Sequence, residues 1–137
     1  HDKSIQTWIQ IVRAFNKIRT KELKYINECG LTMNQFEVLE VLYHRGSLNI
    51  GEITKLIMST PGNVTVVVKN LTRDGLIEIT NSKEDSRIRI VNITEAGCEL
   101  IGGMFARHAE NLASYFEVLS DEELAVVYDL VRKLQKY

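Results

Sequence analysis

The stretch from Ser59 to Thr80 reads STPGNVTVVVKNLTRDGLIEIT, and the change of pattern within it decides the fold. Thr60 and Pro61 are typical of a helix start, because a threonine side chain caps free N–H groups and proline has no N–H to leave unsatisfied. The helix is predicted to end at Gly75, a residue suited to a left-handed cap. Its apolar residues recur at steps of three and four, as in a helix that packs on a core, and they are Val64, Val67, Val68 and Leu71.

The β-branched run at residues 65–68 leaves a strand as the alternative interpretation of this stretch. The helical period, the Thr-Pro start and the terminal glycine favour the helix. Beyond the glycine the pattern changes to period two, over residues 76–80 and again over 87–93, with polar residues 81–86 between them. The sequence therefore predicts a two-stranded hairpin with a projecting tip.

Two helices are predicted upstream, and each opens with a capping box, in which two side chains satisfy helix-start N–H groups reciprocally. Thr32 and Gln35 open the first, which is predicted to end at Gly46, and Asn49 and Glu52 open the second, which is only about two turns long. Helix, short helix, helix and hairpin is the order of a winged helix-turn-helix. We therefore expect a mainly α fold with a small β-hairpin wing, an α+β arrangement in which the 61–73 helix enters the major groove of DNA.

Long amphipathic helices are predicted on both sides of this lobe, at residues 4–27, 95–118 and 121–136. Together they carry more apolar surface than so small a lobe can cover, so a second copy of the chain is the simplest partner. Two-fold symmetry in turn predicts a palindromic DNA site. The last helix has a short heptad seam made of Leu124, Val127, Val131 and Leu134.

The outward face of the 61–73 helix has a composition that suits DNA. Asn63 can pair with adenine, and the methyl groups of Thr65 and Val66 can touch the thymine 5-methyl group. Basic side chains further along the helix can reach phosphates, as can the N–H groups at its start. The alternative is an ordinary solvated face whose polar side chains only cap the helix. The predicted contacts are Ser59, Thr60, Gly62, Asn63, Thr65, Val66, Lys69 and Arg73.

The hairpin tip concentrates basic side chains, with Lys83, Arg87 and Arg89 falling within seven residues. An arginine on an extended tip can enter the narrow, electronegative minor groove. Asp85 stands two residues before Arg87 and could hold its guanidinium in a bidentate pair, which would orient it for DNA. The alternative is a modest surface salt bridge.

Composition places limits on the function. Seventeen Lys and Arg against eighteen Asp and Glu give a net charge of −1, so any attraction to phosphate must come from local clusters. Cys29 and Cys98 are too few for a disulfide framework, and no apolar run approaches the ~20 residues of a membrane span. The start at His1 has no signal-peptide pattern, and the missing initiator methionine suggests that a few residues were trimmed or left out. We expect a cytoplasmic protein that needs no cofactor and contacts no membrane.

Several short stretches recur in the order and spacing of one family of regulators. They are Leu31-Thr32 with Gln35-Phe36 and Leu39; Leu48 to Ile53; Pro61 to Thr65, running to Leu71; Arg73 to Ile77; Glu84-Asp85 with Arg87; Ile93-Thr94 with Gly97; and Leu119-Ser120 with Glu123-Leu124. In these stretches the chain resembles the MarR family of winged helix-turn-helix transcriptional regulators, over nearly its full length.

The resemblance implies one MarR-like domain that forms a homodimer. Residues 1–30 and 95–137 would supply intertwined dimerisation helices, and residues 31–94 would form the DNA-binding lobe. It also implies that Arg87 is the wing arginine and Asp85 its partner. Ser86 departs from the family, which often has a second arginine there.

A switch is also implied, because family members commonly lose DNA affinity on binding a small aromatic or phenolic effector, a metal or an oxidant. Cys29 could sense oxidation, and His44 and His108 could bind a metal, yet no paired His spacing is present and neither thiol has neighbours typical of a reactive cysteine. An effector pocket between the dimerisation helices and the lobe is one interpretation of the following residues, and plain core is the other. They are Trp8, Phe15, Phe36, Tyr43, Met104, Phe105 and His108.

Three classes of function are thus separable. A DNA-binding repressor should show salt-dependent affinity for a palindromic duplex. A winged-helix module that docks another protein should show none. An enzyme is disfavoured, since we find no nucleophile beside a base, no glycine-rich phosphate loop and no paired carboxylates outside the wing and the helix caps.

Overall fold

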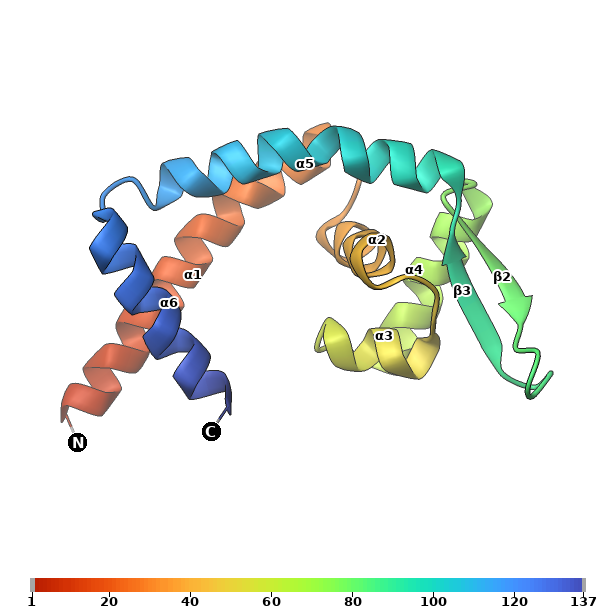
Figure 1. Cartoon of the computed structure of the whole chain (residues 1–137), viewed down its shortest axis with the longest axis horizontal. Helices are drawn as coiled ribbons and strands as arrows, with labels where there is room; N and C mark the ends of the chain where they lie inside the picture. The colour runs from red at the N-terminus through yellow and green to blue at the C-terminus, as the bar shows by residue number, and fades with distance from the viewer. Residues whose placement is uncertain (1, 137) are drawn as a thin grey trace. The chain divides into compact units, whose positions relative to one another are not determined.

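The structure, a computed structural model, describes Asp2 to Lys136 and confirms the predicted mainly helical fold with a β wing (Figure 1). Within that range no helix is long and apolar enough to cross a membrane. The elements in chain order are α1 (Asp2–Glu28), α2 (Met33–Arg45), β1 (Leu48–Asn49), α3 (Ile50–Leu56), α4 (Pro61–Arg73), β2 (Ile77–Asn81), β3 (Arg89–Ile93), α5 (Glu95–Tyr115) and α6 (Asp121–Lys136).

The chain divides into two compact units. The central unit is Leu23–Ala106, and the terminal unit combines the chain up to Glu22 with the chain from Arg107 onward. The hydrophobic core lies in the central unit, where α2, α3, α4, the sheet and parts of α1 and α5 contribute side chains. Its most deeply buried members are Ile26, Val38, Leu39, Leu42, Ile53, Val64, Leu71, Ile77 and Val91.

The starts of the helices follow the capping signals in the sequence. Thr32 and Gln35 form the expected reciprocal box at α2, and Asn49 and Glu52 form the expected box at α3. At α4 the Thr60 side chain accepts from the backbone N–H of Asn63. Residues 65–68 are helical, so the strand interpretation of that run is wrong.

The wing sheet has three strands, in the order β1–β3–β2 with antiparallel pairing, where the sequence predicted two. The additional strand β1 is only two residues long, and its Leu48 pairs with Val91 of β3. On the other side of β3, Val91 pairs with Ile79 of β2. Val91 is fully buried, so the wing is anchored to the core at the middle of β3.

Two further expectations are corrected. The helical spacing of Ile50, Ile53 and Leu56 predicts an apolar, inward face for the third helix, but Leu56 is 41% exposed, because α3 ends at this residue and packs chiefly through Ile53. Phe116 was predicted inside the fifth helix, which instead ends at Tyr115 and is followed by a short turn to α6.

A hydrogen-bonded joint connects α4, β2 and α5 inside the central unit. The Thr94 hydroxyl donates to the carbonyl of Gly75 (2.7 Å), accepts from the N–H of Gly97 (3.1 Å), and the Thr94 N–H donates to the carbonyl of Leu76 (3.1 Å). Gly97 is buried, and a Cβ there would overlap the carbonyl oxygen of Leu76 and lie 2.7 Å from Ile93 Cγ1. The first turn of α5 thus packs directly on the backbone that follows α4.

The terminal unit exposes most of its apolar side chains. On α6 no residue is buried, and the predicted heptad seam lies open to solvent from Leu124 at 37% to Leu134 at 63%. On α1 the exposed fractions of Trp8 and Phe15 are 65% and 57%. Within Asp2–Lys136, much of the apolar surface of both helices is therefore open to solvent.

One buried polar cluster joins α1 and α5 within the terminal unit. Glu22 is 5% exposed, and its carboxylate accepts from His108 Nδ1 at 2.5 Å and from the Tyr115 hydroxyl at 3.0 Å. The Lys21 ammonium lies 5.4 Å from the centroid of the Tyr115 ring. Burial of the phenol, and next its hydrogen bond to Glu22, raise the pKa of Tyr115 above its ordinary value of 10.0.

Candidate nucleic-acid interface

The helix pair α3–α4 presents one face of α4 outward. Val64, Val68 and Leu71 are buried and Val67 is partly buried, which fixes the rotation of the helix. Opposite to them lies an exposed set that matches the sequence prediction, with Ser59 alone half-buried. The exposed set is Thr60, Gly62, Asn63, Thr65, Val66, Lys69 and Arg73.

Local hydrogen bonds limit which groups on this face of α4 are available for contact with DNA. The Thr65 hydroxyl donates to the Pro61 carbonyl at 2.7 Å, so this side chain has its methyl group left for outside contact. The Arg73 Nε donates to the Asp74 carboxylate at 3.3 Å. The basic end of α4 is therefore partly neutralised at Arg73, and Lys69 is the exposed cation on α4 for which no carboxylate partner is seen within Asp2–Lys136.

The wing tip carries the bidentate pair expected between Asp85 and Arg87. The Arg87 Nε and Nη2 atoms donate to the two Asp85 oxygens, each at 3.1 Å, and the Arg87 backbone N–H donates to Asp85 Oδ1 at 3.1 Å. These bonds, the side-chain one first, lower the pKa of Asp85, and the carboxylate raises the pKa of Arg87. Both groups stay charged at neutral pH, while the Arg87 side chain remains 89% exposed.

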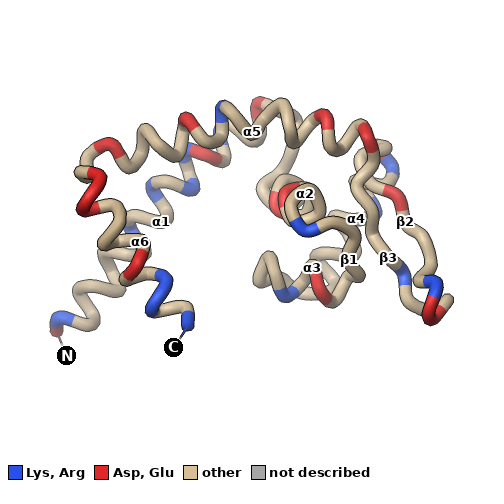
Figure 2. The backbone as a smooth tube through the Cα atoms, in the orientation of Figure 1, with Lys and Arg blue, Asp and Glu red and all other residues tan. Residues whose placement is uncertain are grey.

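The rest of the tip is ordered by its own backbone. Ser82 N–H donates to the Ile88 carbonyl and Ile88 N–H donates to the Asp85 carbonyl, which closes the turn. Lys83 and Arg89 are exposed on either side, and Figure 2 shows acidic and basic positions adjacent at this tip. An exposed arginine is thus held on a closed, hydrogen-bonded turn.

Sequence reasoning missed two residues in this region. Asn92 of β3 donates to Thr80 Oγ1 at 3.0 Å and its Oδ1 accepts from Ser47 Oγ at 2.6 Å, so one amide connects the base of the wing to the chain before β1. Met58, in the turn before α4, is 92% exposed and has a φ of 56°. The available signal for Asn92 was a polar residue in an otherwise alternating strand. The signal for Met58 was an apolar residue between two predicted helices.

The predicted effector residues divide between the two units. In the central unit Phe36 and Met104 are buried in the core, whereas Tyr43 and Phe105 are 40% and 52% exposed. His44 makes edge contacts with both of these rings, at centroid distances of 5.2 and 6.0 Å. In the terminal unit Trp8 and Phe15 are exposed, and His108 is hydrogen-bonded to Glu22.

The sequence also suggested a redox-sensing cysteine and a metal-binding histidine. Cys29 and Cys98 are both free and half-buried. Across Asp2–Lys136 no group of three His, Cys, Asp or Glu side chains is placed to hold a metal ion.

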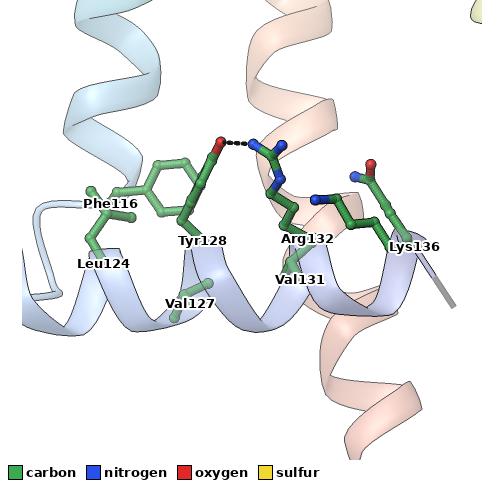
Figure 3. A pocket seen from close by; sticks show the side chains of 8 residues that line it. Phe116, Leu124, Val127, Tyr128, Val131, Arg132 and Lys136 are labelled. Carbon is green, nitrogen blue, oxygen red and sulfur yellow. Dashed lines mark hydrogen bonds between the residues drawn. The ribbon is translucent and has the colours of Figure 1, made fainter.

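A groove of about 710 Å³ runs along one side of α6 in the terminal unit (Figure 3). Apolar side chains dominate it, and a hydrogen bond of 2.9 Å from Arg132 to the Tyr128 hydroxyl crosses its edge. The lining residues include Phe116, Leu124, Val127, Tyr128 and Val131.

A core-packed helix-turn-helix followed by a β wing places the fold in the winged helix-turn-helix class. Residues 31–88 match the MarR family. The chain is 32% identical to the HTH-type transcriptional regulator MhqR of Bacillus subtilis (strain 168), over 97% of this chain and 92% of that protein. The chain therefore belongs to the MarR family of DNA-binding transcriptional regulators and is not an enzyme.

Solved structures share the fold across nearly the whole chain. Bordetella bronchiseptica BpsR, whose DNA binding is regulated by 6-hydroxynicotinic acid, has a TM-score of 0.86 at 24% identity, covering 95% of this chain and 98% of BpsR. A mutant MarR from E. coli complexed with operator DNA has a TM-score of 0.86 at 20% identity, covering 96% and 95%.

Proposed function

We propose that this protein is a homodimeric repressor that binds a palindromic operator in duplex DNA, with α4 in the major groove and the wing in the minor groove. The observation that carries the proposal is the division of α4, buried through Val64, Val68 and Leu71 and open on its opposite, polar and methyl-rich face. The complex of the structurally similar E. coli MarR with operator DNA supports this docking mode.

The base contacts are assigned to the start of α4 and the phosphate contacts to its far end and the wing. Asn63 is suited to adenine, and Lys69 to a phosphate. Arg87 is suited to the minor groove because Asp85 already orients its guanidinium. The complete proposed set is Ser59, Thr60, Gly62, Asn63, Thr65, Val66, Lys69, Arg73, Lys83, Asp85, Arg87 and Arg89.

The dimer is supported by the open apolar faces of the terminal unit. The heptad seam of α6 and the rings of Trp8 and Phe15 on α1 are exposed in one chain. A second copy would cover these faces symmetrically, as an isologous contact requires. Two lobes related by a two-fold axis fit two half-sites of a palindrome, and occupancy of such a site would exclude RNA polymerase from an overlapping promoter.

The dimer is tested by sedimentation of the wild type and of Val131→Asp, which places a charge in the α6 seam. We expect the wild type to sediment as a dimer and the variant as a monomer. Lys133→Asp, on the opposite side of the same helix, is the matched control and should leave the dimer intact. A monomeric wild type would contradict the proposal.

DNA binding is tested by selecting ligands from random duplexes and measuring affinity at several salt concentrations. Lys69→Ala should lower the slope of log affinity against log salt by about one unit per half-site, because each lost phosphate contact releases about one fewer counterion. Arg87→Ala should weaken binding more than Lys69→Ala. No salt-dependent affinity for any duplex would leave the protein-docking alternative in its place.

A small aromatic or phenolic effector that releases the operator is proposed as the switch. The regulation of BpsR by 6-hydroxynicotinic acid supports this class of compound, as do the half-exposed rings of Tyr43 and Phe105. Adding hydroxylated aromatic acids to the operator complex is the test. Release of DNA by one of them, reduced in Phe105→Ala, is the expected result, and no response to any compound of the class would contradict it.

A further inference from the structure

The C-terminal end of α3 has the same hydrogen-bond pattern as the ends of α1 and α4, but a different residue at its critical position. Met58 N–H donates to the Lys55 carbonyl and Ser59 N–H donates to the Thr54 carbonyl. The corresponding residues after α1 and α4 are Gly30 and Gly75, with φ of 84° and 77°. Within Asp2–Lys136, Met58 is the single non-glycine residue with a positive φ.

Methionine at this position is unfavourable for the fold. A Cβ atom in the left-handed region crowds the neighbouring carbonyl, which is why helices that end in this motif prefer glycine. The Met58 side chain recovers nothing by packing, since it is 92% exposed. Strained backbone positions are concentrated at functional sites, so the side chain itself requires an explanation outside the fold.

The surroundings of Met58 indicate what it contacts. It directly precedes Ser59 and Thr60, the residues that lead into α4. On α4 the Val66 side chain is 60% exposed, and one turn before it Gly62 has no atom within 4 Å of where a Cβ would be. Two exposed apolar side chains, Met58 and Val66, thus lie four residues before and after the open backbone position at Gly62.

We propose that Met58, together with Val66, contacts thymine 5-methyl groups in the major groove, so that each operator half-site carries thymine where the α3–α4 turn meets it. The inference rests on the proposed DNA-binding function. The thymine methyl is the apolar group on base-pair edges in the major groove. An unbranched, polarizable methionine side chain can reach and adapt to it from outside the helix.

The test replaces each thymine of a selected operator with deoxyuridine, one position at a time, which removes only the 5-methyl group. For wild-type protein we expect affinity to fall about fourfold at the contacted position, the value for one buried methyl-sized group. Met58→Gly should lose this preference between thymine and uridine, and Met58→Leu should retain it. Met58→Gly should also unfold at a higher temperature, by roughly 2–5 °C.

Gly30→Met is the matched control for the backbone, since a Cβ there meets no atom within 4 Å. It should lower the unfolding temperature by a similar amount and leave DNA affinity unchanged. Equal weakening of Met58→Gly on thymine and uridine duplexes would overturn the methyl contact. So would a wild type indifferent to uridine at every position. In both of these cases DNA binding, and with it the proposed function, would stand; a wild type that binds no duplex would overturn both.

Discussion

Asp85 holds the guanidinium of Arg87 through two parallel hydrogen bonds of 3.1 Å and also accepts from the Arg87 backbone N–H. The carboxylate therefore fixes both the side chain and the local backbone of the wing tip. Since the Arg87 side chain stays 89% exposed, this arrangement orients the charge and leaves it accessible to an approaching phosphate or groove.

Asp85→Ala should weaken operator binding about fivefold per protomer, because a side chain that must be ordered on binding costs about 1 kcal/mol. Thermal unfolding should be unchanged, since the pair is on the surface. Arg87→Lys keeps the positive charge but should also bind the operator more weakly than the wild type, because an ammonium lacks the planar fork that pairs with the carboxylate. Titration of labelled operator measures both. Asp74→Ala, which releases Arg73 from a single hydrogen bond, is the control and should have the smaller effect.

The buried carboxylate of Glu22 should be important for stability. Glu22→Ala leaves the His108 ring nitrogen and the Tyr115 hydroxyl without their shared acceptor, which should cost about 2–3 kcal/mol of the free energy of unfolding. Glu22→Gln retains an acceptor oxygen and should cost less. Urea unfolding at constant protein concentration measures the difference. Equal stability of the alanine variant and the wild type would contradict the role given to this cluster.

Alkaline pH should destabilise the terminal unit through Tyr115. Burial, and then the bond to Glu22, raise the folded-state pKa of the phenol above 10.0, so the folded protein retains the proton longer than the unfolded chain does. The contribution is fully present below pH 10 and is lost as the pH rises through the folded-state pKa. The urea midpoint of the wild type should therefore fall more steeply above pH 10 than that of Tyr115→Phe, which has no phenol to ionise. Parallel pH profiles would refute this.

Gly97→Ala should disrupt the joint between α4 and α5. Its Cβ would overlap the Leu76 carbonyl oxygen, a backbone atom that cannot rotate away, and overpacking of this kind costs roughly 1–3 kcal/mol. Gly103→Ala on the same helix is the matched control, because no atom lies within 4 Å of that position. The control should be more stable than the wild type by roughly 0.5–1 kcal/mol. Calorimetry of the two variants should give shifts of opposite sign.

Local signals account for most of what the sequence predicted correctly. The boxes at Thr32 and Asn49 and the Thr60-Pro61 start are each contained within four residues, so the sequence alone locates the helices they open. The Asp85–Arg87 pair is also local, being two residues apart. The roles assigned to the DNA-contacting residues stay predictions.

Long-range contacts account for most of what was missed. Strand β1 exists because Leu48 pairs with Val91 far along the chain, and two residues are too few to show a period. The Glu22–His108 bond joins residues 86 positions apart, and neither residue type in its local setting indicates the other. The left-handed backbone of Met58 is not predictable from the sequence, because a helix break does not specify which residue takes that conformation.

The hydrogen bonds of Thr94 fix the start of α5 to the segment that follows α4. Its 21 residues span about 30 Å at 1.5 Å per residue, and its first turn is fastened to the backbone that immediately follows α4. A tilt of about 5° about the Thr94 joint would displace the far end of a helix of this length by about 2.5 Å. In the proposed dimer, the direction of α5 would therefore set the direction of α4 and, with it, the spacing of the two DNA-binding lobes.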